Sequence, residues 1–238
     1  MSMRPGRGRM TRTPDADVVW FAPLWPSLIS VVVAAVLLLS GCVAIRPPKM
    51  KMARGPAPGE AAVEDFLSQW PRPSSRLFTG TLVMAHQHVE VLGLWRFRTP
   101  WSFRLSVAGI HGHPLFEVRA NWAGVHLLRL RPGFSKKLAL AIGHDFSLAA
   151  RLPSERKTIR VGRHQTRIVM RDAWGHIIIW QFAGSAGRLR QMLVRRSVGD
   201  ILTVRYGGYG LRDWPDAMAF YRPALAYALA IRFSLMGH

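Results

Sequence analysis

Cysteine is nearly absent from this 238-residue chain, because Cys42 is the only one. A disulfide within the chain is therefore impossible. Acidic side chains are also scarce: 13 Asp and Glu stand against 33 Lys and Arg, and the formal net charge is +20. Such a charge favours anionic partners, namely acidic phospholipid, lipopolysaccharide phosphate or nucleic acid. Only a few of the basic residues are Lys, so an arginine-rich codon usage is an alternative explanation of part of the excess.

Motifs of known catalytic chemistry are missing as well. The sequence contains no Gly-x-Ser-x-Gly, no His-Glu-x-x-His and no glycine-rich loop before a helix. The acidic residues of the later chain, such as Asp145, Asp172 and Asp200, are scattered singly, so no paired carboxylates are indicated. We therefore predict no enzyme and no cofactor.

Histidines occur twice at a spacing of two, as His86 with His88 and as His111 with His113. This spacing places both rings on one face of a strand and is compatible with zinc or copper. No cysteine and no cluster of carboxylates completes such a site, apart from the single Glu90. Exposed strand histidines are the simpler interpretation, and we predict no metal.

An export signal is indicated at the N-terminus. Four arginines precede an apolar stretch that is purest over residues 28–39, and this stretch ends in Leu39-Ser40-Gly41-Cys42. These four residues resemble the lipobox of bacterial lipoproteins, which implies cleavage after residue 41 and acylation of Cys42, for example with palmitate. The alternative is an uncleaved membrane helix over residues 18–45, but Pro23 and Pro26 interrupt it. Export argues against nucleic acid as a partner.

Residues 42–59 contain Pro47, Pro48, Gly55, Pro56 and Pro58 and have no hydrophobic period, so we expect a flexible tether. An amphipathic helix is then predicted over residues 60–70. Its apolar side chains follow the spacing i, i+3, i+4 and i+7: Val63, Phe66, Leu67 and Trp70.

From residue 77 onward the hydrophobic period changes to two, which is typical of strands with one buried face. The segments that show it are 78–86, 89–98, 102–107, 115–121, 125–130, 165–170, 176–182, 189–196, 201–206 and 224–236. We predict a mainly β domain over residues 60–238. Its fold is a meander in which a single curled antiparallel sheet of roughly ten strands forms an unclosed barrel, with the N-terminal helix and short helical lid elements.

The order of these features resembles the LolB family of outer-membrane lipoprotein receptors, and more broadly the LolA/LolB fold, over most of residues 66–236. Two short stretches support the resemblance: residues 79–81 at the start of the first strand, and residues 104–107 leading through 109–112 into 115–118. The most specific part is the end of a late strand together with the loop after it: Tyr206, Gly207, Gly208, Tyr209 and Pro215.

The resemblance implies an exposed apolar side chain in the loop between the strands of residues 102–107 and 115–121. That position is Ile110, flanked by Gly109 and Gly112, where an apolar tip is useful as a membrane wedge. The alternative is an ordinary hairpin tip whose isoleucine folds back onto the sheet.

A half-barrel of this kind has a concave face suited to acyl chains. The side chains expected to line it are Trp95, Phe97, Phe103, Leu105, Phe116, Val118, Trp180 and Phe182. The alternative is that the same side chains fill a solid core. Residues 134–151 depart from the family, because this segment is predicted to be short and only loosely helical, with Gly143 inside it. We therefore expect a reduced lid.

The resulting hypothesis is a monomeric outer-membrane lipoprotein that faces the periplasm. It would take acylated lipoproteins from a LolA-like periplasmic carrier and help to insert them into the outer membrane. Val43 after the cysteine, in place of Asp, agrees with this destination. The alternative is a lipoprotein of the same fold that binds lipid, lipopolysaccharide or a protein partner without transferring anything.

Overall fold

The computed structural model describes residues 57–70, 74–85, 87–99, 102–151, 158–172, 174–209 and 214–234. The chain divides into two compact units, Met1–Val43 and Ala44–His238, and all described residues belong to the second. The predicted signal peptide over 1–41, Cys42 and nearly all of the tether over 42–59 lie outside the described residues. Within the described part, no helix is long and apolar enough to cross a membrane.

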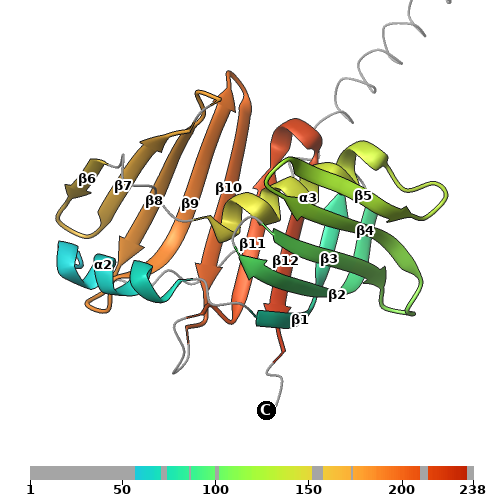
Figure 1. Cartoon of the computed structure of the whole chain (residues 1–238), viewed down its shortest axis with the longest axis horizontal. Coiled ribbons are helices and arrows are strands. Elements are labelled where there is room, and N and C mark those ends of the chain that lie inside the picture. The colour runs from blue at the N-terminus through green and yellow to red at the C-terminus, as the bar shows by residue number, and fades with distance from the viewer. Residues whose placement is uncertain are drawn as a thin grey trace, which may run out of the picture. The chain divides into compact units, whose positions relative to one another are not determined.

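A single antiparallel sheet dominates the described part of the chain (Figure 1). It has twelve strands: β1 Ser74–Met84, β2 Gln87–Thr99, β3 Ser102–Gly109, β4 Pro114–Asn121, β5 Gly124–Leu130, β6 Thr158–Val161, β7 Thr166–Arg171, β8 Ile177–Ala183, β9 Arg188–Ser197, β10 Asp200–Gly207, β11 Ala217–Arg222 and β12 Tyr227–Phe233. The predicted mainly β class and unclosed sheet are confirmed, since β5 and β6 remain as two edges.

The strand order corrects the expectation of one continuous meander. The order is β5-β4-β3-β2-β1-β12-β11-β10-β9-β8-β7-β6, so β1 and β12 pair in the middle of the sheet. Two meanders, β1–β5 and β6–β12, are thus joined along the first and last strands. The roughly ten strands predicted from the sequence are twelve, because β6 has only four residues and the small alanines of β11 hide its alternation.

Alternation along the strands produces one buried and one wetter face, as the period of two predicts. In β3, Phe103, Leu105 and Val107 are buried while Arg104 is exposed. In β12, Tyr227, Leu229 and Ile231 are buried, although this strand begins only after a short 3-10 helix, η1, over Pro223–Leu225. The buried face carries the core.

Helix α2 spans Glu60–Gln69, and the predicted apolar face is the buried one. Phe66 contacts Phe182 of β8, with ring centroids 6.0 Å apart, and Trp70 stacks on Trp214 at 4.4 Å. Just before the helix, the Thr166 hydroxyl of β7 donates a hydrogen bond of 2.6 Å to the Pro58 carbonyl. The helix therefore covers one end of the later strands.

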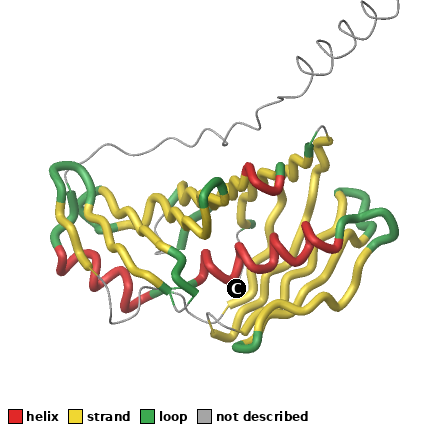
Figure 2. The backbone as a smooth tube through the Cα atoms, turned by 90° about the horizontal axis from the view of Figure 1, so that it is seen from above, coloured by secondary structure: helices red, strands yellow, loops and turns green. Residues whose placement is uncertain are grey.

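Helix α3 corrects the prediction of a short, loosely helical segment. It is a regular helix of 15 residues, Lys136–Ala150, and its N-terminus is capped by the Ser135 hydroxyl, which accepts from the Leu138 N–H at 3.2 Å. It connects the half of the chain that ends at edge strand β5 with the half that begins at edge strand β6. Figure 2 shows α3 running across the open side of the curved sheet.

Candidate functional site: the concave face of the sheet and helix α3

The eight side chains predicted to line a cavity all face the buried side of the sheet, and none is more than 4% exposed. Six of them lie on the adjacent strands β2, β3 and β4, where Trp95 is opposite Leu105 and Leu105 is opposite Val118. The other two, Trp180 and Phe182, lie on β8 in the other half of the sheet. The structure therefore brings six together and places two apart, with Phe182 against α2.

An aromatic cluster around Trp95 includes rings that the sequence interpretation missed. The Trp95 centroid lies 4.9 Å from Phe146 of α3, 5.7 Å from Trp214 and 6.4 Å from Phe233. Phe146 also stacks on Phe220 at 4.6 Å. Each such pair adds about 0.5–1.5 kcal/mol beyond the burial of its area. Alternation in β12 was the available signal for Phe233. Phe220 lies in β11, where the alanines hide the alternation, and Phe146 required the helix to be recognised.

Helix α3 approaches β4 and β5 closely because residue 143 is a glycine. A β-carbon at this position would lie 2.8 Å from a methyl group of Val118 and 2.8 Å from a methyl group of Val125. Gly143, which the sequence suggested as a weak point in the helix, is therefore the point of contact between helix and sheet.

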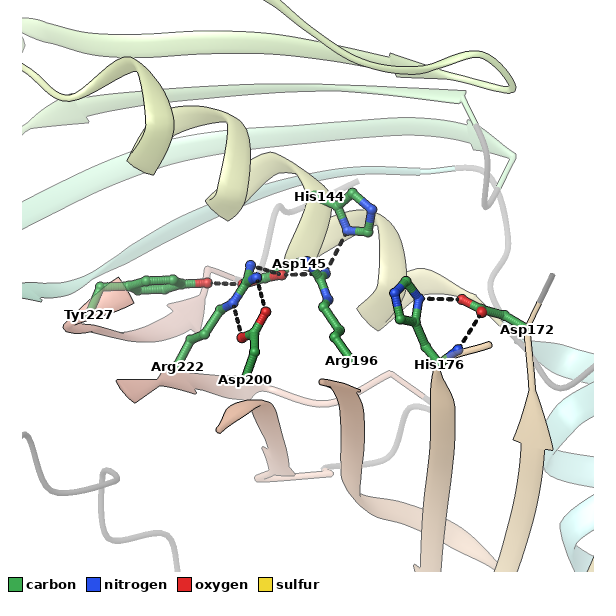
Figure 3. Close-up of polar contacts among 8 residues, drawn as sticks. All are labelled: His144, Asp145, Asp172, His176, Arg196, Asp200, Arg222 and Tyr227. Atoms are coloured by element: carbon green, nitrogen blue, oxygen red, sulfur yellow. Dashed lines mark hydrogen bonds and ion pairs between the residues drawn. The ribbon is translucent and has the colours of Figure 1, made fainter. Parts of the chain in front are cut away.

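The C-terminal half of α3 carries a buried polar cluster, which Figure 3 shows. The Asp145 carboxylate, fully buried, accepts from Arg222 of β11 at 3.2 Å, from Arg196 of β9 at 3.1 Å and from the Tyr227 hydroxyl of β12. Arg222 also donates two hydrogen bonds to Asp200, at 2.9 and 2.7 Å. One carboxylate on the helix is thus bonded to three separate strands.

His144, next along the helix, lies against the same cluster, with its Nδ1 2.8 Å from an Arg196 nitrogen. Burial, together with Arg196, Arg151 and Arg222, lowers the pKa of His144 to about 4. Burial raises the pKa of Asp145 to about 6, although Arg222 and Arg196 oppose the rise. The hydrogen bonds from Arg222 lower the pKa of Asp200. Two carboxylates therefore balance two guanidinium groups around a neutral imidazole.

A groove of about 600 Å³ opens beside the N-terminal end of α3. It lies between the β1–β2 hairpin, the start of β4 and the segment that leads into the helix, and its lining is largely apolar: Met84, Ala85, Gln87, Val89, Leu115, Arg131, Pro132, Gly133, Phe134, Ser135 and Leu138. Phe134 stacks on the predicted lining residue Phe116 at 5.3 Å. The sequence interpretation did not identify this groove, because it forms only where three separate segments meet.

No family profile matches this sequence, and no curated protein does. Among solved structures, the chain is similar to a LolA superfamily protein from Nitrosomonas europaea, with a TM-score of 0.51 and 8% identity. The match covers 75% of this chain and 92% of that one. This chain has a LolA-type fold. A second similarity, to an outer membrane lipoprotein-sorting protein domain from Vibrio parahaemolyticus, has a TM-score of 0.45 and 8% identity over 74% of this chain and 90% of that one.

In this LolA-type fold, the predicted family motif connects the sheet to both helices. The Tyr206 hydroxyl donates to the Ala149 carbonyl of α3 at 3.3 Å, and its ring packs edge-on against Trp70, just after α2. The Tyr209 hydroxyl donates to the Leu189 carbonyl at 2.6 Å. Gly207 ends β10. The Gly208 carbonyl accepts from the Asp216 N–H at 3.2 Å, and the neighbouring Pro215 is buried. The motif residues therefore have structural contacts.

Ile110 lies in the β3–β4 loop and is 61% exposed. Its N–H donates to the Glu90 carbonyl at 3.0 Å, and the Gly112 N–H closes the turn onto the Gly109 carbonyl at 2.8 Å. The side chain thus projects from a tight turn. Its role in a membrane stays a prediction.

Of the paired histidines, His88 lies on β2, and His111 and His113 lie in the β3–β4 loop. The fourth, His86, falls outside the described residues. Among the residues that are described, no group of three or more His, Cys, Asp or Glu side chains is placed to hold a metal ion.

Proposed function

We propose that this chain is an outer-membrane lipoprotein, anchored through Cys42, that receives acylated lipoproteins from a periplasmic carrier and helps to insert them into the membrane. The observation that carries the proposal is the apolar concave face of the sheet in this LolA-type fold. Helix α3 covers this face, and an open apolar groove lies beside the helix. Concave apolar surfaces with few polar groups are suited to acyl chains.

The groove beside α3 is the proposed entrance for an acyl chain. Its apolar side chains include Val89, Leu115 and Leu138, and the predicted lining residue Phe116 lies directly behind Phe134. Burying one methylene of an acyl chain contributes roughly 0.8 kcal/mol, so even a part of a chain gains several kcal/mol there.

Deeper binding requires α3 to move away from the sheet. The polar contacts of this helix gather in its C-terminal half, at His144, Asp145 and Ala149, whereas Leu138, Ala139 and Ile142 make the N-terminal half apolar. An acyl chain can replace apolar contacts without leaving a polar group unpaired. We therefore expect the N-terminal half to yield first, which would expose the six aromatic and aliphatic side chains of β2–β4.

Photocrosslinking tests the entrance. A photoreactive benzoylphenylalanine replaces Leu138 or Val89 in the full-length protein, which is then irradiated with a triacylated lipopeptide. We expect adducts at both positions, because both side chains line the groove.

The matched control for this experiment places the same group at Val161, an exposed aliphatic residue that ends strand β6 at the other edge of the sheet. Labelling at Val161 that equals labelling at Leu138 would remove the support for a defined acyl site, and so would an absence of adducts at all three positions.

Depletion of the protein in cells separates transfer from binding alone. If the chain inserts lipoproteins, its depletion leaves them at the inner membrane, and a variant with Ile110→Glu, which puts a charge on the exposed loop tip, fails to restore sorting. Normal lipoprotein sorting during depletion would instead favour the alternative, a lipoprotein that binds lipid, lipopolysaccharide or a protein without transfer.

A further inference from the structure

Three arginines and one histidine form a continuous row across four adjacent strands on the outer face of the sheet. Arg96 of β2 is directly opposite Arg104 of β3, Arg104 is opposite Arg119 of β4, and Arg119 is opposite His126 of β5. All four residues are exposed. We call this set the arginine row.

Folding by itself does not favour this arrangement, because like charges directly opposite each other on neighbouring strands are destabilising. One acid lies beside the row: Glu117, which forms an ion pair with Arg104 and accepts from the Ser106 hydroxyl at 2.7 Å. The row therefore keeps a net positive charge in the folded protein.

A cleft of about 340 Å³ lies over the row. Four arginines border it, since Arg98 of β2 joins Arg96, Arg104 and Arg119, and Ser102 and the exposed Leu128 complete its rim. Guanidinium groups bind phosphate oxygens in a bidentate manner, and the neighbouring leucine offers contact to an apolar chain. The cleft thus combines features that match a lipid headgroup.

We propose that the arginine row binds the phosphate groups of anionic phospholipids at a membrane surface. Neighbouring strands lie about 4.8 Å apart, so the row extends over roughly 14 Å and presents its charges in a line rather than at a point. Juxtamembrane arginines are attracted to anionic lipid surfaces. This site lies on the outer face of the sheet, opposite to the groove beside α3.

The length of the preceding chain selects a membrane as the occupant. Fourteen residues lie between Cys42 and Ala57, the first described residue, and the distance between these two residues is at most about 54 Å when the chain is fully extended. This step rests on the proposed anchor at Cys42. An anchored domain then meets the membrane surface at a high effective concentration, whereas a soluble acidic protein has no such advantage.

Vesicle flotation of the full-length protein tests the site. The measurement compares phosphatidylcholine vesicles with and without phosphatidylglycerol, so that apolar insertion of the N-terminal segment is common to both, and every variant keeps the same four N-terminal arginines. We expect wild type to prefer the anionic vesicles and Arg96→Gln/Arg119→Gln to lose about 30-fold of that preference, at about fivefold per arginine.

The matched control is Arg160→Gln/Arg163→Gln, which removes the same charge from exposed positions at and just after edge strand β6. It should keep the wild-type preference. An equal loss in both double variants would mean that net charge alone acts, and it would overturn the proposal, as would a wild type without any preference.

Three further measurements help to interpret the result. Thermal unfolding should show Arg96→Gln/Arg119→Gln to be at least as stable as wild type, since a repulsion is removed, and Arg98→Gln alone should lose about fivefold. Polyglutamate binding tighter than anionic vesicles would assign the row to an acidic protein and overturn the lipid assignment. Failure of the lipopeptide crosslinking would leave this outcome unaffected, because the two sites lie on opposite faces.

Discussion

His144 and Asp145 are neighbours on α3 and respond to acid in opposite directions. The pKa of Asp145 is raised above 3.8, so its contribution to folding stability is fully present at low pH and is lost as pH rises through about 6. The pKa of His144 is lowered below 6.5, so its contribution is present above that pH and is lost as pH falls through about 4. In wild type the two effects oppose each other over the same pH range.

Substitution of His144 should therefore reveal the response of Asp145. Gln retains an oxygen that can accept from Arg196 but does not titrate. We expect the free energy of unfolding of His144→Gln, measured with urea, to increase as pH falls from 6.5 to about 5, while wild type changes little. Replacing the exposed His126 with Gln is the control and should follow wild type. If the free energy of unfolding of His144→Gln instead stayed as constant over this pH range as that of wild type, the prediction would be contradicted.

None of the polar cluster around Asp145 was predicted as a unit. The sequence shows Asp145, Asp200 and Arg222 as isolated residues far apart in the chain, and it shows no spacing that links them. The cluster exists only because α3 passes over β9, β11 and β12. By contrast, Ile110 was placed on a loop by the family resemblance together with its flanking glycines, and the structure does expose it.

Helix α3 and helix α2 differ in how far the sequence predicted them. The face of α2 repeats with the helical period, and the packed face is the predicted one. In α3, apolar and polar residues are both buried, including Asp145 and Ser147, because strands from both halves of the sheet contact it. A helix buried on several sides has no clear polar face, so its amphipathic signal is weak.

The contact of α3 with β4 and β5 at Gly143 can be tested by a double substitution. Gly143→Ala gains up to about 1 kcal/mol of helix propensity, but its methyl group meets the stiff side chains of Val118 and Val125. We expect a net loss of about 1–2 kcal/mol in the free energy of unfolding, as is typical of overpacking.

Val118→Ala provides the space that this methyl group needs. The loss caused by Gly143→Ala should be smaller in the Val118→Ala background, as a double-mutant cycle of chemical unfolding would show. Gly109→Ala is the control, since a β-carbon there meets nothing closer than 4.0 Å. Strictly additive losses would argue against a direct contact between the helix and Val118.

The whole sheet depends on the pairing of its first and last strands, β1 and β12. At Gly80, opposite Ile231, a β-carbon would overlap the Ala230 carbonyl oxygen and lie 2.9 Å from the Ile231 α-carbon, so the two backbones approach each other more closely than a side chain allows. Strand β1 is separated from β12 by most of the chain, and such non-local pairing forms late and slowly.

Gly80→Ala should therefore disturb the junction of the two meanders. We expect a loss of about 3 kcal/mol or more in the free energy of unfolding, because the rigid backbone of β12 must shift to admit the methyl group. The control is Thr81→Ala at the neighbouring residue. It removes the hydroxyl that donates to Glu90 at 2.8 Å, and it should lose about 1 kcal/mol or less in the free energy of unfolding. Similar losses for both variants would show that the junction tolerates a side chain at residue 80.

The sequence by itself determined most of the strands, their buried faces, α2 and the mainly β class, because alternation and helical spacing are local consequences of where successive side chains point. Only the tertiary structure decided that β1 pairs with β12, that α3 lies over the concave face, that Asp145 meets its two arginines, and that Arg96, Arg104 and Arg119 align. The alignment depends on the registers of separate strands, which irregularities between Phe97 and Thr99 and between Val107 and Ala108 shift. Which residues pair across distant strands depends on how the whole sheet packs, and a local sequence pattern does not contain this information.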